Sequence, residues 1–340
     1  MSMYALWLKK YEEKRKNILE NLKRYKKEIN DIKSKLTDEK IISDVPEYDD
    51  KNDIKLRKLC FVDGGEGVEE LLGCVIYYIR ASALFLHYKN EKFVRNLDVG
   101  ILKYDDNTKE RVELLRGIME FDVAEKCIKE NSPEYVFLDG SLYVNSKKRE
   151  VECKEYGIFM KKFSRLLRLC KDRNIHLCGI SEDSQSRLLI NYLSFKRDIK
   201  FPSFMTDSTM LKIFAGNRKF VTKEFVPESK FEFQNNSQLV KFPTIYLQPT
   251  PLSNPLRIDI PNWEKKKFKE IISIIVKLSR GSKWYGYPYP LYLVHLDAKI
   301  EKKQTEWNTR QIIHHITKDD PELYDTIFKK KRRSVRPEGL

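Results

Sequence analysis

Two aspartates, Asp63 and Asp139, each follow a short apolar segment and precede glycine. The segments, residues 59–62 and 135–138, are typical of buried β-strands. A carboxylate at the end of such a strand is held by the sheet yet stays accessible at its edge, and glycine lets a bulky ligand approach the backbone. Asp-Gly is also an ordinary turn signal, so either aspartate alone is a weak indication. As a pair they are candidate catalytic carboxylates.

The elements between the two aspartates have an informative order. The pattern predicts two further strands, at about 70–86 and 93–103, and then a helix over about 108–131. Asn107 and Glu110 are expected to form a capping box at the start of this helix. The second aspartate then ends the next strand. This is the element order of the ribonuclease H-like fold, in which the helix supplies a middle carboxylate between the two strand aspartates.

Three acids of the predicted helix are candidates for that middle carboxylate. Glu113, Gly117, Glu120 and Ala124 share one face by their spacing of three and four residues. Glu120 borders the apolar stripe and is the first choice, with Glu113 and Asp122 as alternatives. A solvated glutamate on the helix surface is the competing interpretation of Glu120.

Three converging carboxylates bind hard divalent cations, so Mg²⁺ or Mn²⁺ suits them better than Zn²⁺. Such an ion can activate water and stabilise the leaving oxygen in phosphodiester cleavage. His295 is a further candidate, because the pattern places it at the end of a strand-like segment, residues 291–295, just before Asp297 and Lys299. There it could bind the metal or orient the scissile phosphate.

The composition limits the class of protein. Among 340 residues, 65 Lys and Arg against 50 Asp and Glu give a net charge of +15. This excess favours a polyanionic partner, although a lysine-rich solvated surface explains it about as well. The six cysteines have no zinc-type spacing and lie mostly in apolar stretches, which favours a reducing, cytoplasmic location. No apolar run approaches the roughly 18 residues of a membrane span, and the sequence contains no P-loop.

The N-terminal residues, 1–40, are expected to form one long helix for assembly. Residues 4–38 contain neither Gly nor Pro, and their apolar residues alternate at spacings of four and three, which is typical of a coiled-coil seam. Packing of the helix on its own domain is the alternative. The seam consists of Ile18, Leu22, Tyr25, Ile29, Ile32 and Leu36.

The rest of the chain is expected to form a linker (41–57), one globular domain (58–316) and a basic C-terminal tail (317–340). Strands and helices alternate in the second half of the domain, which indicates an α/β fold. Beyond the second aspartate the pattern predicts helices at 151–173, 183–195 and 262–279, and strands at 176–180, 219–225, 243–248 and 291–295.

Four short motifs, in order, resemble the NurA family over residues 55–316. They are Phe-Val-Asp-Gly-Gly at 61–65, Phe-Leu-Asp-Gly-Ser-Leu at 137–142, Gly-Ile-Ser-Glu-Asp-Ser at 179–184, and Gly-Tyr-Pro-Tyr-Pro-Leu at 286–291 running to His-Leu-Asp-Ala-Lys at 295–299. The resemblance implies an Mn²⁺-dependent nuclease that degrades DNA 5′ to 3′ and cuts single strands internally during double-strand-break end resection. It also implies a homodimer that docks on a HerA-type hexameric ATPase.

The resemblance also assigns residues. Asp63 and Asp139 match the acids of the first and second motifs, and Glu120 matches the intervening helix acid. Tyr287 and His295 match the late aromatic and histidine positions. We therefore expect an α/β fold with a ribonuclease H-like core, in which a mixed central sheet is flanked by helices, together with an N-terminal coiled-coil-like helix.

Two residues depart from the family pattern. Glu66 stands where the family usually has a small hydroxyl residue, and Glu182 where it tends to have lysine, so a phosphate contact is either lost or supplied by Arg187. The aromatic residues of 284–289 could stack on unpaired bases or belong to the core. The departures leave a second hypothesis open, a non-catalytic DNA-binding or motor-regulating subunit on a decayed nuclease fold. A nuclease of the same fold acting on RNA or branched DNA is a third.

Overall fold

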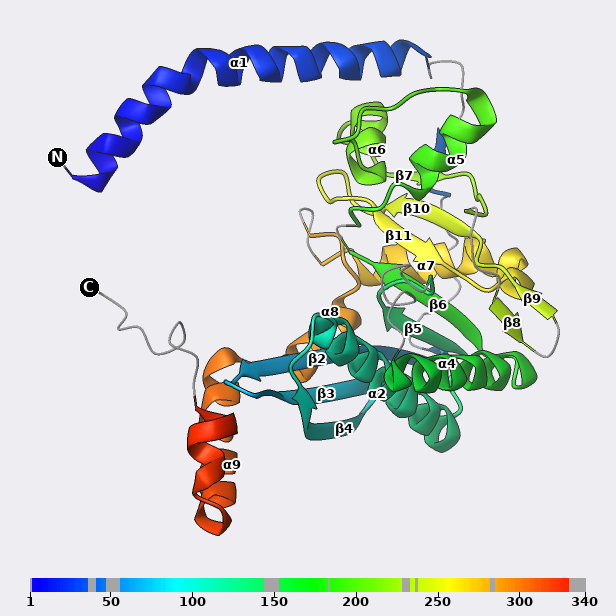
Figure 1. The fold of residues 1–340 in the computed structure, drawn as a ribbon. Coiled ribbons are helices and arrows are strands. Elements are labelled where there is room, and N and C mark those ends of the chain that lie inside the picture. Colours follow the sequence, from blue (N-terminus) through cyan, green and yellow to red (C-terminus); the bar gives the residue numbers. More distant parts are fainter. Residues whose placement is uncertain are drawn as a thin grey trace.

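A computed structural model describes residues 2–35, 41–46, 56–143, 153–182, 184–227, 233–235, 238–281 and 285–329. Within these residues one nine-stranded mixed sheet runs through the molecule, in the order β1-β7-β10-β11-β6-β5-β2-β3-β4 (Figure 1). The strands are β1 (Ile42–Ser43), β2 (Leu59–Glu70), β3 (Cys74–His87), β4 (Asn90–Lys103), β5 (Tyr135–Asp139), β6 (His176–Ser181), β7 (Phe220–Thr222), β10 (Thr244–Gln248) and β11 (Leu256–Asp259). A separate two-stranded sheet joins β8 (Phe233–Asn235) and β9 (Gln238–Val240).

The strand order around the two aspartates confirms the predicted element order. β2, β3 and β4 form an antiparallel meander, whereas β5 pairs in parallel with β2 and β6 pairs in parallel with β5. The β2–β5 register aligns Val62 with Leu138, the residues that directly precede Asp63 and Asp139. The two carboxylates therefore lie side by side, because neighbouring parallel strands in register carry equivalent residues to the same edge.

Side-chain alternation along β2 divides the core into two layers. Cys60 and Val62 pack with α2 (Thr108–Asn131) and α4 (Lys154–Asp172) on one face of the sheet. Leu59 and Phe61 pack on the opposite face with α7 (Phe268–Leu278) and α8 (Tyr289–Ala298). Because the side-chain period of a strand is two, Asp63 points to the face of α7 and α8. Asp63 on β2 and the candidate acids of α2 therefore lie on opposite faces of the sheet.

The prediction that the first strand ends at Asp63 is wrong, because β2 continues to Glu70. Gly64 and Gly65 have no positive φ and lie in extended backbone, so they do not form a turn. Each is required by close packing instead. A Cβ on Gly64 would lie 2.6 Å from Glu120 Oε1, and a Cβ on Gly65 would lie 2.2 Å from the carbonyl oxygen of Ala298.

The segment 291–295, expected to be a strand, lies within helix α8, so His295 does not end a strand. The apolar run has the buried spacing of a helix, since Leu291, Val294 and Ala298 all face the core. Pro290 lies in the first turn of α8, where a missing amide hydrogen has no cost. The helix presents His295 to the sheet face toward which the first aspartate points.

Three further helical expectations differ in detail. The helix predicted at 183–195 is α5 (Leu188–Arg197), because the buried Asp207 carboxylate accepts from the amides of Leu189 and Ile190 and thereby defines its start. The expected capping box of α2 is absent, since Asn107 makes no side-chain cap. The helix predicted at 262–279 begins with a 3₁₀ turn, η2 (Asn262–Lys267), before α7.

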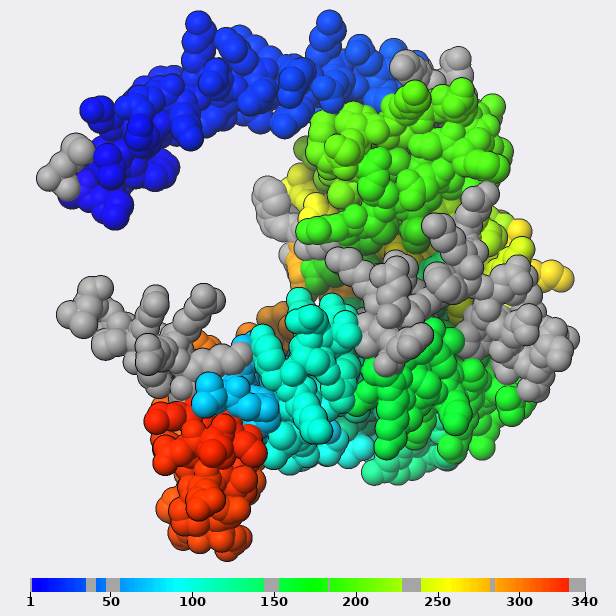
Figure 2. Space-filling model, in the orientation of Figure 1, coloured from blue at the N-terminus to red at the C-terminus, as the bar shows by residue number. Residues whose placement is uncertain are grey.

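The N-terminal helix α1 (Met3–Lys35) extends away from the rest of the fold except at its C-terminal end (Figures 1 and 2). There Ile32 is buried in a cluster with residues of α5 and α6 (Asp207–Ala215). Farther along the seam, Ile18 and Leu22 are 42% and 55% exposed. The long helix is confirmed over Met3–Lys35, and only the last turns of this part pack on its own domain. Residues 36–40, with Leu36 of the seam, lie outside the described residues. Its role in assembly stays a prediction.

The boundary segments are more ordered than expected in the described part of the chain. The expected linker contains β1, whose Ile42 pairs with Thr222 of β7, while residues 47–55 lie outside the described residues. The expected tail begins inside α9 (Lys302–Asp319) and continues into a π-helical turn, η3 (Tyr324–Phe328). The side chain of Phe328 is buried against β3, whereas residues 330–340 lie outside the described residues. No helix among the described residues is long and apolar enough to cross a membrane.

Candidate active site

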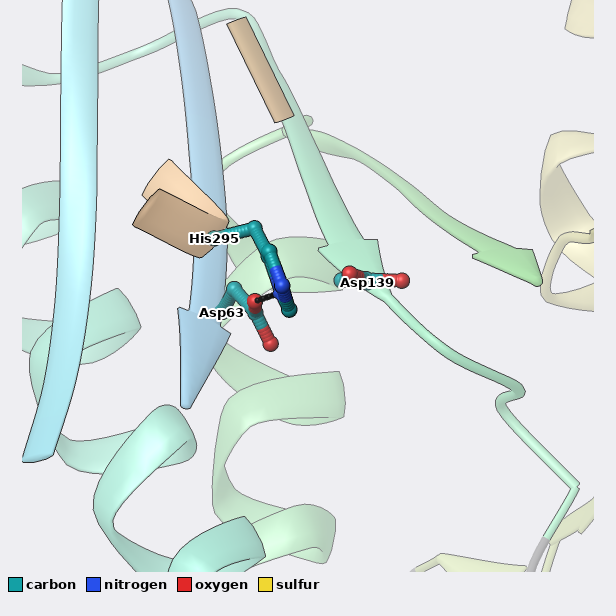
Figure 3. A group of neighbouring side chains, drawn as sticks. All are labelled: Asp63, Asp139 and His295. Atoms are coloured by element: carbon teal, nitrogen blue, oxygen red, sulfur yellow. Dashed lines mark hydrogen bonds and ion pairs between the residues drawn. The ribbon is translucent and has the colours of Figure 1, made fainter. Parts of the chain in front are cut away.

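Three side chains converge where β2, β5 and α8 meet. Asp63, Asp139 and His295 each offer a ligand atom, and these atoms lie within 4.8 Å of one another (Figure 3). His295 Nδ1 lies 3.0 Å from Asp63 Oδ2, and the other carboxylate oxygen of Asp63 accepts from the Gly64 amide at 2.6 Å. Asp63 is buried, Asp139 is partly buried and His295 is exposed. The cluster therefore has a fixed interior side and a side open to a ligand.

The second aspartate lies at the true end of a strand. β5 ends at Asp139, and Gly140 follows with φ +111, a conformation that favours glycine. The Gly140 amide donates to the Ile180 carbonyl at 2.7 Å. Beyond it, Ser141 donates to Asp259 Oδ2 at 2.8 Å. These contacts fix the chain immediately after Asp139, so this carboxylate is held in place from both sides.

The helix that carries the histidine is held to the sheet by Asp297. Its carboxylate accepts from Arg95 at 2.7 and 2.9 Å and from Ser82 at 2.6 Å. Ser82 is paired in register with Asp63 on one side and with Arg95 on the other, so the three residues form one row across β2, β3 and β4. Along this row α8 is attached by two residues, His295 and Asp297. The sequence showed Asp297 only as a neighbour of the histidine, and nothing in the pattern indicated this contact.

Burial and mutual repulsion perturb both aspartates. Burial raises the pKa of Asp63, although the Gly64 amide, His295 and a nearby arginine act in the opposite direction. Burial and then the neighbouring Asp63 charge raise the pKa of Asp139 to about 7. Two carboxylates held close together and away from water cannot both ionise without cost, and a bound cation would remove that cost. The electrostatics of the pair therefore favour a positively charged ligand.

Tyr287, the residue that matches the late aromatic position of the family, lies beside Asp139. Its side chain is buried, and its hydroxyl has no partner with regular hydrogen-bond geometry among the described residues. The hydroxyl is nevertheless close enough to Asp139 to favour the charged carboxylate. Burial and the Asp139 charge raise the pKa of Tyr287 well above its ordinary value, so the phenol stays protonated and is available as a donor.

The expected middle acid, Glu120, lies near this cluster but does not belong to it. It approaches β2 from the α2 face, against Gly64, and its Oε1 accepts from Arg116 at 3.0 Å. Of the alternatives, Asp122 pairs with Lys162 of α4. Glu113 lines the same cavity as Glu120.

That cavity has a volume of about 250 Å³ and opens beside the end of β5. It is lined by Glu113, Arg116, Glu120 and Asp139, together with apolar and aromatic side chains that include Phe159. Asp139 thus belongs to the cluster with His295 and also lines the cavity that contains Glu120. The sequence analysis missed Arg116, although its position one helical turn before Glu120 is an ordinary pairing distance.

Glu66 and Glu182, the two residues that depart from the family pattern, each contact a specific side chain. Glu66 Oε2 lies 3.2 Å from Nε of Arg116. Glu182 accepts from the Tyr285 hydroxyl at 3.4 Å, and its charge contributes to the raised pKa of Asp139, after burial and Asp63. Arg187, the alternative source of the missing phosphate contact, donates instead to the main-chain carbonyls of Pro202, Ser203 and Met205.

Comparison with known proteins gives consistent matches. A family model described as the NurA domain matches residues 57–300. The DNA double-strand break repair nuclease NurA of Sulfolobus acidocaldarius is 26% identical over 269 residues, which cover 74% of this chain and 79% of that protein. The protein of the same name from Sulfurisphaera tokodaii is 24% identical over 292 residues, with 78% and 83% covered.

Solved structures share the fold. The NurA nuclease of Sulfolobus solfataricus superposes with a TM-score of 0.67 at 21% identity, covering 94% of this chain and 98% of that one. A crystal structure of NurA bound to dAMP and manganese superposes with a TM-score of 0.55 at 12% identity, covering 84% and 94%. Because the family model spans well over half of the 340 residues, this chain belongs to the NurA family.

Proposed function

We propose that this protein is a metal-dependent DNA nuclease with a ribonuclease H-like core. The observation that carries the proposal is the convergence of Asp63, Asp139 and His295 at the junction of β2, β5 and α8. Family membership supports it, since the curated relatives are named DNA double-strand break repair nucleases. The strand order β4-β3-β2-β5-β6 agrees with the ribonuclease H-like arrangement that the element order predicts. The net charge of +15 suits a phosphate-rich substrate.

The residues present fit a divalent cation. Two carboxylates with raised pKa values and an imidazole form a donor set that suits Mn²⁺, and Mg²⁺ is the alternative. The buried Tyr287 hydroxyl without a regular partner is a further polar group directed at the site. Asp63, Asp139 and His295 would hold the ion, and Glu120 is the acid that would join them from the cavity side. A similar structure was solved with manganese and dAMP, which supports the same choice.

The chemistry expected of the site is hydrolysis of a phosphodiester bond. When bound, the cation would lower the pKa of an attacking water and stabilise negative charge on the phosphate. The protein's own residues orient the reacting groups. Asp63 holds the His295 imidazole at 3.0 Å, and the imidazole is exposed, so a substrate phosphate can reach it. The protonated Tyr287 phenol is available to donate to Asp139 or to a phosphate oxygen beside it.

We further propose that the enzyme degrades DNA 5′ to 3′ and cuts single strands internally during end resection in the cytoplasm, as a homodimer on a HerA-type hexameric ATPase. The family resemblance supports these finer statements. The helix α1 supports the assembly, because Ile18, Leu22 and Tyr25 of its seam are exposed along an arm that extends from the domain. A regulatory subunit without catalysis is the weaker candidate, since it leaves the metal-ligand geometry without a role.

Cleavage assays test the proposal. Labelled single- and double-stranded DNA would be incubated with the purified protein in Mn²⁺, Mg²⁺ or EDTA. The proposal expects cleavage with at least one metal and none in EDTA. Undiminished cleavage in EDTA would exclude the metal mechanism. Absence of cleavage with either metal, alone or with the ATPase, would favour the regulatory subunit.

A further inference from the structure

One guanidinium lies between α2 and β2, beside the proposed metal site. Arg116 of α2 donates to Glu120 Oε1 at 3.0 Å and to the carbonyl of Gly64 at 3.2 Å. On its other side, Nε of Arg116 lies 3.2 Å from Oε2 of Glu66 on β2. Arg116 therefore lies between two carboxylates, one on the helix and one on the strand.

The two carboxylates are not equivalent partners. The contact with Glu120 has regular hydrogen-bond geometry, whereas Arg116 Nε and Glu66 Oε2 are both buried and have no regular hydrogen-bond partner among the described residues. Arg116 and Glu66 are thus within ion-pair distance but do not form a hydrogen bond of regular geometry. A small movement of the guanidinium toward β2 would complete it at the expense of Glu120.

This arrangement lies against the ion site itself. The side chains of Glu120 and Arg116 occupy the space where a Cβ of Gly64 would be, directly after Asp63. Glu120 and Arg116 also line the cavity of about 250 Å³ that contains Asp139. The charge of Arg116 reaches Asp63, where it lowers the pKa against the opposing effect of burial. The same positive charge must repel a cation that approaches Glu120 or Asp63.

We propose that Arg116 acts as a built-in counter-charge that occupies Glu120 in the metal-free site, and that Glu66 receives the guanidinium when Glu120 turns to bind a divalent cation. The proposal rests on the function proposed above. It gives the unusual Glu66 a role, because this residue supplies a second anionic position for a charge that would be costly to leave unpaired in a partly buried site. Arg116 is then a positioning residue that sets how readily Glu120 becomes a metal ligand.

The test measures the affinity of the protein for Mn²⁺ at pH 8 without DNA. The electron paramagnetic resonance signal of the free ion reports how much Mn²⁺ stays unbound. Glu120-dependent binding is the difference between each protein and the same protein carrying Glu120→Gln. Arg116→Met should tighten this component about tenfold, and Glu66→Gln should weaken it about tenfold, each equal to roughly one hydrogen bond to a charged group. Equal Glu120-dependent binding in parent and Arg116→Met would overturn the proposal.

A double variant separates the switch from simple electrostatics. If Glu66 acts through Arg116, then Glu66→Gln has no further effect in the Arg116→Met protein. A loss of binding in that background would show that Glu66 attracts the ion directly, which would overturn its role as a receiver. Arg111→Met is the matched control, since Arg111 lies on the same helix but pairs with Asp105 and Glu155.

Two further outcomes are informative. Glu66→Gln is nearly isosteric, so it tests the proposal even where Arg116→Met lowers stability, and circular dichroism verifies folding of both. If the parent protein binds no Mn²⁺ at all, the proposed function itself is contradicted. The proposal about Arg116 fails separately, when the parent binds Mn²⁺ through Asp63 and Asp139 but neither variant changes the Glu120-dependent part.

Discussion

Replacing Asp139 by Asn should stabilise the metal-free protein while removing its activity. The pKa of Asp139 is raised from 3.8 to about 7, first by burial and then by the Asp63 charge. A carboxyl with a raised pKa keeps its proton longer in the folded state than in the unfolded state. The contribution of the Asp139 carboxyl to the free energy of unfolding is therefore fully present below about pH 4, and it is lost as the pH rises through 7. Ionised Asp139 destabilises the fold at pH 8, and the neutral amide of Asn does not.

The size of the effect follows from the pKa difference. About three pKa units at roughly 1.36 kcal/mol each give a gain of at most about 4 kcal/mol for Asp139→Asn at pH 8 without metal. At pH 5 the gain should be less than half as large, because Asp139 of the folded parent is then largely protonated. In a domain of this size the pH 8 value corresponds to a rise in Tm of roughly 5–10 °C. Saturating Mn²⁺ should reverse the order, since only the parent binds the ion well.

Thermal unfolding in EDTA at pH 5 and pH 8, and in Mn²⁺ at pH 8, measures all three effects. Asp105→Asn is a matched control. Burial raises the pKa of Asp105, but hydrogen bonds from Arg111 and neighbouring groups outweigh this effect and lower the pKa. Asp105→Asn should therefore destabilise the protein at pH 8. Asp139→Asn with a lower Tm than the parent in EDTA at both pH values would refute the reasoning and indicate a structural Asp-Gly turn.

The remaining predictions concern the other site residues and the N-terminal helix. Asp63→Asn should remove nearly all cleavage and leave DNA affinity intact or slightly higher, measured by gel assay and fluorescence anisotropy, because affinity comes mainly from Lys and Arg contacts to phosphate. His295→Ala should reduce cleavage less severely than Asp63→Asn in the same assay. Asp297→Asn should weaken Mn²⁺ binding in the parent but add little in the His295→Ala background, and equal losses in both would contradict a role through the histidine. Deleting residues 1–40 should change the mass seen by light scattering or abolish co-elution with the ATPase, whereas no change in either would assign the helix to its own domain.

Strand order was the most predictable part of the site. Two apolar segments ending in Asp-Gly, separated by two strands and a helix, are enough to bring Asp63 and Asp139 together, because parallel pairing of β2 and β5 is the consequence of that order. The two glycines after Asp63 led to the wrong prediction that the strand ends there, and the reason is physical. Glycine indicates a turn in a sequence, but Gly64 and Gly65 serve close packing inside a strand, and only the tertiary neighbours show which applies.

Helical elements near the site were harder to predict. The segment 291–295 is short and apolar, and such a run fits a buried strand or a buried helix equally well by periodicity. Helical spacing correctly placed Glu120 on the face of α2 that meets the sheet, but spacing gives no information about the partner across the interface. The ion pair with Arg116 and the contacts of Asp297 depend on residues distant in sequence, so a single sequence could not indicate them.

The central claim is that Asp63, Asp139 and His295 bind a catalytic divalent cation. A crystal of the protein soaked in Mn²⁺ tests it most directly, with data collected at a wavelength where manganese scatters anomalously. If these three residues bind the ion, an anomalous peak should lie within about 2.0–2.3 Å of a carboxylate oxygen from each aspartate and of an imidazole nitrogen. The peak should be absent from Asp139→Asn crystals. Active protein whose only manganese peak lies elsewhere would contradict the account.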